Sequence, residues 1–242
     1  MTMGRLTSRA VVRVSPRDES ENAAAFLQGL LTNDVTGETP VYAGLLTPQG
    51  KAMFDMLVWR EGADMLLDCE GDYAEELAKR LSLYRLRRAI DIAVDPSLAV
   101  LWSDAEGDGL KPDPRLSALG YRGIAAADPP QEGVDAAYLA TRLSHGVAEG
   151  REELGDVLWL ETNAADLNGV SFAKGCYIGQ ENTARMNWRQ KVSRRLVVVP
   201  LDQSDEKRRK ACYAGQGQAV DHLRVTDIST DLVPEWMSLE LD

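Results

Sequence analysis

The sequence predicts an α+β fold, because short strands joined by turns are interrupted by amphipathic helices. The clearest sign is a hairpin, in which residues 41–46 and 52–59 read as strands around the turn Pro48-Gln49-Gly50. A second sign is that the sequence has no regular alternation of strands and helices and no glycine-rich phosphate loop. These absences argue against a Rossmann fold.

The other elements follow from local periodicity. Residues 9–14 (RAVVRV) alternate as an opening strand, and apolar residues at spacings of three and four predict a helix from Ala23 that ends near Asn33. The later elements are expected, in order, as a strand at 65–69, a helix at 73–84, strands at 90–94 and 98–102, a loop at 107–114, helices at 135–145 and 180–186, and a strand at 194–200. The charged run 203–210 (QSDEKRRK) is expected to separate the last strand from a short tail.

Composition narrows the class of protein. With 44% apolar and 27% charged residues in 242, the chain matches soluble globular proteins, and no apolar run is long enough to cross a membrane. The formal net charge of −11 would repel phosphate backbones, so direct nucleic-acid binding is not expected. The three cysteines Cys69, Cys176 and Cys212 are far apart, which fits a reducing compartment and no metal site.

The segment 168–186 (NGVSFAKGCYIGQENTARM) carries the chemistry of the sequence. Cys176 lies near Lys174 and just before a helix that starts at Gln180, and both a cation and a helix N-terminus favour the thiolate. Gly175 and Gly179 bracket the cysteine and allow a ligand to approach the main chain. The alternative, which the residues alone favour, is a tight turn around a small buried cysteine.

A family resemblance favours the functional interpretation of Cys176 over the structural one. Residues 174–181 (KGCYIGQE) match the K-G-C-Y-x-G-Q-E stretch of the YgfZ family at every specified position. The segments 26–35 (FLQGLLTNDV) and 45–58 (LLTPQGKAMFDMLV) are similar to further family segments, in the expected order. The chain therefore resembles a YgfZ-type folate-binding protein, a relative of the T-protein (aminomethyltransferase) of the glycine cleavage system.

The resemblance implies an architecture and a role. The fold would be T-protein-like around a central cavity, with a folate-binding domain at 1–193 and a short C-terminal β domain, a truncated barrel, at 194–242. The protein would bind tetrahydrofolate and assist the assembly or repair of iron-sulfur proteins, and through them tRNA modification. Its partners would be folate and iron-sulfur proteins or their assembly factors, in the cytoplasm or, in a eukaryote, the mitochondrial matrix.

The resemblance also assigns site residues. Cys176 and Lys174 would be the active pair, and no metal site is expected. The residues expected to bind the folate are Asp55, Tyr177, Gly179, Gln180, Glu181 and Arg185. Arg185 opens a basic stretch, 185–195, that could attract the anionic tail of a folate, although an exposed helix face explains it as well.

Two departures from the T-protein pattern leave alternatives open. T-proteins usually carry two adjacent acidic residues where this chain has Phe54-Asp55, and a pterin-binding glutamate where this chain has Ser144. One alternative is a folate-dependent aminomethyl or methyl transferase, which Asp55 favours and both departures disfavour. The other is a non-catalytic interaction scaffold.

Overall fold

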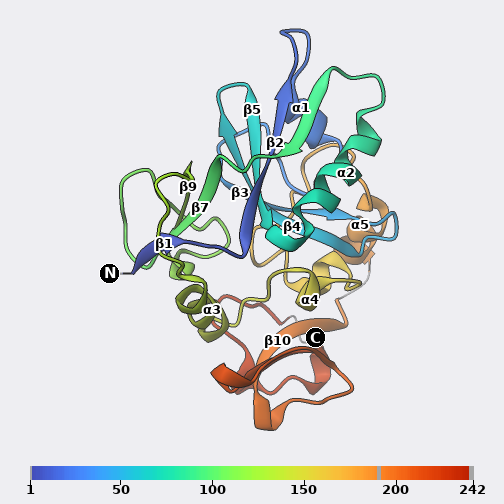
Figure 1. Cartoon of the computed structure of the whole chain (residues 1–242). Helices are drawn as coiled ribbons and strands as arrows, with labels where there is room; N and C mark the ends of the chain where they lie inside the picture. Colours follow the sequence, from blue (N-terminus) through green and yellow to red (C-terminus); the bar gives the residue numbers. More distant parts are fainter. Residues whose placement is uncertain (1, 190–191, 240–242) are drawn as a thin grey trace.

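The computed structural model describes residues 2–189 and 192–239 and confirms the mixed α and β architecture. Its strands form three antiparallel sheets (Figure 1). The five-stranded sheet has the order β3 (Val41–Leu46), β4 (Ala52–Glu61), β5 (Asp64–Glu70), β2 (Arg9–Pro16) and β6 (Ile90–Val94). The four-stranded sheet has the order β1 (Met3–Arg5), β7 (Leu98–Ser103), β9 (Tyr121–Ala126) and β8 (Lys111–Pro112). The three-stranded sheet has the order β10 (Arg194–Pro200), β12 (Gln218–Arg224) and β11 (Arg209–Tyr213).

Five α-helices connect these sheets. They are α1 (Ala23–Gln28), α2 (Ala74–Arg85), α3 (Asp135–Ser144), α4 (Arg151–Leu154) and α5 (Gln180–Arg189). Single 3₁₀ turns occur at Gly71–Tyr73, Ser117–Leu119, Trp159–Thr162, Leu201–Gln203, Ala214–Gln216, Val225–Asp227 and Thr230–Leu232. Among the described residues, no helix is long and apolar enough to cross a membrane.

The five-stranded sheet has two buried faces. On one face Phe54, Met56 and Val58 of β4 pack with apolar residues of α1 and α2. Alternation along the strand turns Asp55, Leu57 and Trp59 to the opposite face. That face meets a second core to which the four-stranded sheet, α3 and the C-terminal sheet all contribute. Asp55 thus points into the centre of the molecule, where the sheets meet.

Two expectations from the sequence are wrong in detail. The first helix ends at Gln28, because Gly29 caps it and Leu31 leaves the helix to form a bridge with Leu45 of β3. The charged run 203–210 does not separate a strand from a tail: β10 and β12 on either side of it pair directly, and Arg209 already belongs to β11. The run is a connection within the C-terminal sheet, which Figure 1 shows below α3 and α4. The division of the chain at residues 193 and 194 into two domains stays a prediction.

Candidate functional site

The loop that carries Cys176 is anchored at Lys174. The Lys174 ammonium donates to the carbonyls of Gln28 (2.7 Å), the last residue of α1, and of Leu31 (2.5 Å) and Asn33 (2.9 Å), which follow it. An ammonium has three N–H donors, so these bonds use all of them. Burial lowers the pKa of Lys174 to about 8, and nearby Asp34 opposes the change. The structure therefore directs this cation to the end of α1, and its expected pairing with Cys176 stays a prediction.

Tyr177 and Gly179 hold the other side of the loop. Tyr177 is buried, with its ring centre 5.3 Å from the Lys174 ammonium. Gly179 has a φ of +81°, and a Cβ there would come within 2.6 Å of the Thr47 carbonyl oxygen. Only glycine fits such a position without strain. Gly175, by contrast, has no atom within 4 Å of where a Cβ would lie, so the need for glycine falls on Gly179 alone.

Cys176 is exposed on this anchored loop. Cys212 is also exposed, whereas Cys69 is buried within the core and its pKa is raised to about 12 by burial. Two aromatic side chains near it in sequence also reach solvent, Phe172 before the loop at 38% exposure and Trp188 near the end of α5 at 75%. Over the part of the chain that the structure describes, no group of three His, Cys, Asp or Glu side chains could hold a metal ion.

The polar residues after Cys176 lie on α5. Gln180 is the first residue of this helix, and Glu181 and Arg185 form an ion pair of 3.0 Å one helical turn apart. Their side chains are 88% and 52% exposed, and ion pairs this exposed contribute less than about 1 kcal/mol. Arg195, at the end of the basic stretch, is instead buried against the Leu160 carbonyl. Residues 190–191 of that stretch lie outside the described part.

Asp55 lies in the interior of the molecule. It is a buried residue of β4, and one of its carboxylate oxygens accepts a hydrogen bond of 3.2 Å from the Gly150 backbone N–H. Burial raises the pKa of Asp55 to about 6 against the opposing charge of Arg9, and Glu149 adds to the rise. The second carboxylate oxygen has no hydrogen-bond donor among the described residues.

A buried ion-pair network surrounds Asp55, and the sequence did not predict it. Glu149 is its centre, with carboxylate oxygens 2.5 Å from Arg115, 3.4 Å from Arg122 and 3.5 Å from Arg9. Burial disfavours the charged form, but the three arginines outweigh it and hold the pKa of Glu149 well below its usual range. The remaining members are Asp68, Asp113 and Tyr138.

The charges of this network explain the state of Asp55. The three arginines are matched by the three carboxylates of Glu149, Asp68 and Asp113. Among the described residues, Asp55 is therefore a fourth carboxylate that forms no ion pair of its own. Low-dielectric surroundings disfavour such an extra charge. A signal of the network was present in the sequence, because Asp68 interrupts the apolar strand MLLDC.

Ser144 is one of the two departures from the T-protein pattern. It is exposed at the end of α3 and donates to the Thr141 carbonyl (2.8 Å). Phe54, the other departure, is buried on the opposite face of β4 from Asp55, with the Arg151 guanidinium 4.9 Å from its ring centre.

The β3–β4 hairpin connects the two parts of the site. Gly179 rests on its turn at Thr47 and Gly50, and the Asn182 amide donates to the Gln49 carbonyl (2.7 Å). Asp55 lies five residues further along the same hairpin. The hydrogen bonds and ion pairs of the described residues do not join Asp55 directly to the cysteine loop, so the hairpin is the shared support.

No protein-family model matches the chain. Among curated proteins, it is 33% identical to the human "Iron-sulfur cluster assembly factor IBA57, mitochondrial", over 96% of this chain and 76% of the relative. The mouse protein of that name is 35% identical over 83% of this chain and 66% of its own length. A homolog from Coccidioides immitis is 30% identical over 84% of this chain and 57% of its own length, so the chain spans only part of these relatives.

A solved structure is also similar. The glycine cleavage system aminomethyltransferase T from Bartonella henselae superimposes with a TM-score of 0.67, covering 93% of this chain and 78% of that protein at 14% sequence identity. At this identity the likeness concerns the fold alone. The expected T-protein-like fold is confirmed.

Proposed function

Because the chain belongs to the family of the iron-sulfur cluster assembly factor IBA57, we propose that it assists the assembly or repair of iron-sulfur proteins through the thiol of Cys176. The resemblance to YgfZ-type proteins with a T-protein fold is confirmed by these relatives and by the aminomethyltransferase structure. Effects on tRNA modification would follow from the iron-sulfur proteins served. The names of the relatives favour a mitochondrial location in a eukaryote. The mitochondrial matrix, and the cytoplasm as the location in a bacterium, stay predictions.

The observation that carries this proposal is an exposed thiol on a loop whose neighbours are fixed. Cys176 faces solvent, whereas Lys174 and Tyr177 on either side are held by hydrogen bonds and burial. A loop fixed in this way holds its thiol in one position. A partner that binds there then orders less of the chain, which favours binding. Such an arrangement supports a reacting thiol better than a packing residue.

The chemistry of clusters requires a second component. Iron-sulfur clusters normally take about four protein ligands, and Cys176 supplies one thiolate. Any cluster that contacts Cys176 would therefore draw its other ligands from an iron-sulfur protein or an assembly factor. The side chain of Phe172, four residues before Cys176, is exposed and suits such a contact, and Trp188 on α5 is a second exposed aromatic residue.

The test replaces one exposed cysteine at a time. In cells that lack their own IBA57-type protein, Cys212→Ser is expected to restore iron-sulfur enzyme activity and Cys176→Ser is expected to fail, at equal protein levels. Cys212 is the matched control because it is also exposed. Full rescue by Cys176→Ser would remove the proposed role of the thiol.

We further propose that the interior next to Asp55 binds tetrahydrofolate. The residues fit in one respect: the free oxygen of the Asp55 carboxylate can accept an N–H from a pterin ring. The residues expected to complete the site are Tyr177, Gly179, Gln180, Glu181 and Arg185. A bound tetrahydrofolate would supply the chemistry of one-carbon carriers, and the chain would hold and orient it.

Calorimetric titration with tetrahydrofolate tests this second proposal. Saturable binding is expected for the native chain and for Cys176→Ser, and its loss is expected for Asp55→Ala. A complete lack of binding by the native chain would favour a non-catalytic interaction scaffold.

A transferase is the alternative function, and one observation favours it. A carboxylate whose pKa is raised to about 6 can exchange a proton near neutral pH, as folate-dependent group transfer requires. Incubation with tetrahydrofolate and an aminomethyl donor would reveal a one-carbon folate product. Its absence, with binding intact, would leave the accessory role.

A further inference from the structure

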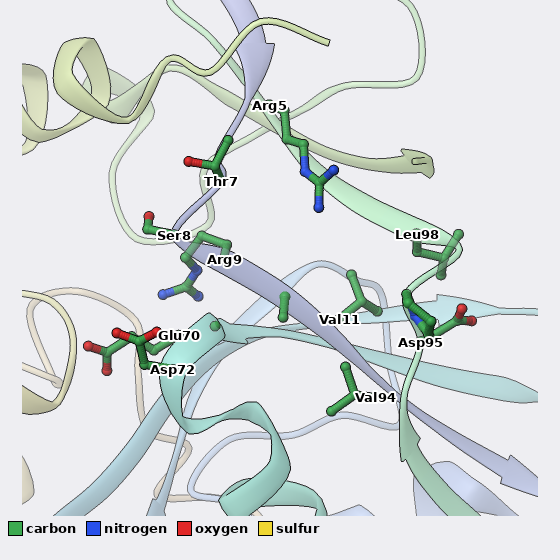
Figure 2. Close-up of a pocket in the computed structure, with 13 residues that line it drawn as sticks. Arg5, Thr7, Ser8, Arg9, Val11, Glu70, Asp72, Val94, Asp95 and Leu98 are labelled. Atoms are coloured by element: carbon green, nitrogen blue, oxygen red, sulfur yellow. The ribbon is translucent and has the colours of Figure 1, made fainter. Parts of the chain in front are cut away.

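A pocket of about 450 Å³ opens where the chain passes between the two larger sheets (Figure 2). Its walls come from the start of β2, the end of β5 and the link between β6 and β7. The volume is in the range of about 300–1,000 Å³ that is usual for small-molecule sites. None of the cysteine-loop residues lines it.

Arg5 is the unpaired cation of this pocket. Its backbone is fixed, because its N–H donates to Glu132 (2.8 Å) and its carbonyl accepts from Val134 (2.9 Å). Its guanidinium forms no hydrogen bond or ion pair within residues 2–189 and 192–239, and its Nε is buried without an acceptor. Buried donors almost always have a partner, and Arg5 faces the pocket, so its guanidinium is available to an acceptor that enters there.

The other charged residues of the pocket differ in whether they are already paired. Arg9 is engaged by Asp68 and Glu149, and Asp95 is engaged by Arg13. Glu70 accepts from the Arg151 backbone (2.8 Å). Asp72 is exposed and has no partner in the described part of the chain.

The pocket therefore has three kinds of surface. Arg5 offers an unpaired positive charge and Asp72 an unpaired negative charge, and Figure 2 shows them on different sides of the pocket. Val94 and Leu98 add an apolar wall. A ligand that satisfies all three has an anionic group, a hydrocarbon part and a cationic group.

We propose that this pocket binds a small amino carboxylate. Its carboxylate lies on the Arg5 guanidinium, whose forked donors match the two oxygens. Its hydrocarbon part lies on Val94 and Leu98, and its ammonium faces Asp72. The acidic side chains of Glu70, Asp72 and Asp95 disfavour a multiply charged anion such as phosphate.

The experiment follows backbone amide shifts of the full chain by NMR. A series of unbranched amino carboxylates, from glycine to 6-aminohexanoate, is titrated, and saturable shifts are expected at Arg5, Ser8 and Gly71. For the best length, the matching carboxylate without the amine and the matching amine without the carboxylate are each expected to bind about tenfold more weakly, because each loses one charged contact. Inorganic phosphate is expected not to compete.

Three variants complete the test. Arg5→Gln and Asp72→Asn remove one charge each and are expected to weaken binding about tenfold. Arg87→Gln removes an exposed arginine outside this pocket and is the control. The Arg5 side chain makes no hydrogen bond with the described residues, so Arg5→Gln is expected to fold, which an unchanged amide spectrum elsewhere would verify. Native-like binding by Arg5→Gln, effective competition by phosphate, or no saturable shift with any member of the series would overturn the proposal.

Discussion

The Lys174 ammonium donates a hydrogen bond of 2.5 Å to the Leu31 carbonyl, which joins the cysteine loop to a segment 143 residues earlier in the chain. Gln28 and Asn33 accept from the same ammonium. The segment after α1 needs such a donor, because the last carbonyls of a helix have no intrahelical partner. The loop and α1 therefore depend on one side chain for their relative position.

Replacing Lys174 by Met tests this dependence. The variant keeps the length of the side chain but leaves three carbonyls without their donor, and we expect the free energy of unfolding to fall by about 2 kcal/mol. Lys111→Met is the control, because Lys111 is exposed and, in the described part of the chain, its ammonium donates only to the Thr39 carbonyl. Its effect is expected to stay within about 0.5 kcal/mol. Urea unfolding of both variants decides, and equal losses would contradict the anchoring role.

The two glycines around Cys176 are expected to differ in tolerance. Gly179→Ala places a Cβ 2.6 Å from the Thr47 carbonyl oxygen at a φ of +81°, which should cost about 1–3 kcal/mol of stability. Gly175→Ala meets open space and should be close to neutral. Thermal unfolding of the two variants measures the difference. If Gly175→Ala were the more damaging of the two, the loop would have a different backbone.

Much of the fold was predictable from local sequence. The strands 41–46, 90–94 and 194–200 and the start of α5 at Gln180 are confirmed, because alternation and helical periodicity are properties of neighbouring residues. The end of α1 was missed, since the bridge between Leu31 and Leu45 draws the chain out of the helix. Strand pairing with β3 overrides the apolar period that continues past Gln28.

The site was predictable only in part. Cys176 could be singled out from its segment, and its exposure shows that it is not the buried cysteine of the alternative interpretation. The network around Asp55 could not be found, because Arg9 and Glu149 are 140 residues apart and a single sequence gives no distances between them. The roles of Asp55 and of the α5 residues in folate binding stay predictions.

The stability of the chain should depend on pH through Asp55. Its folded-state pKa of about 6 is above the unfolded value near ~3.9, so the folded chain binds more protons between these values. The contribution of Asp55 to stability is thus greatest below about pH 4 and is lost as the pH rises through 6. Asp55→Asn cannot titrate and should exceed the native chain in stability by about 1–3 kcal/mol at pH 7 and by little at pH 4.

Urea unfolding at pH 4, 5, 6 and 7 measures this dependence. Asp108→Asn, in an exposed loop, is the control and should follow the native chain at every pH. A stability difference between Asp55→Asn and the native chain that stays constant with pH would show that Asp55 titrates normally.

The three cysteines should differ in reactivity toward an alkylating reagent. The thiolate is the reacting form, and Cys69 is buried with a pKa raised to about 12, so we expect its modification in the folded chain to be at least about a hundredfold slower. Cys176 and Cys212 are exposed and should react readily. Mass spectrometry of the native chain would locate the labels, and unfolding in urea should make all three sites equal. Rapid labelling of Cys69 without denaturant would mean that the core opens there.

The buried network should make Glu149 one of the most sensitive positions in the chain. Glu149→Gln keeps the shape of the side chain but removes one negative charge from beside Arg115, Arg122 and Arg9. Removal of one partner from a buried ion pair costs about 3–5 kcal/mol of stability. Glu181→Gln removes a carboxylate whose ion pair with Arg185 is exposed, and its cost should be below about 1 kcal/mol.

A double variant separates two costs: that of losing the ion pair and that of leaving one buried charge without its partner. Arg115→Met combined with Glu149→Gln removes both partners of the 2.5 Å contact, and its total cost should be less than the sum of the two single costs, because neither charge is then left alone. Urea unfolding of the four proteins of this cycle gives the coupling free energy. Simple additivity would mean that Asp113, which also pairs with Arg115, or water compensates Arg115 when Glu149 is absent.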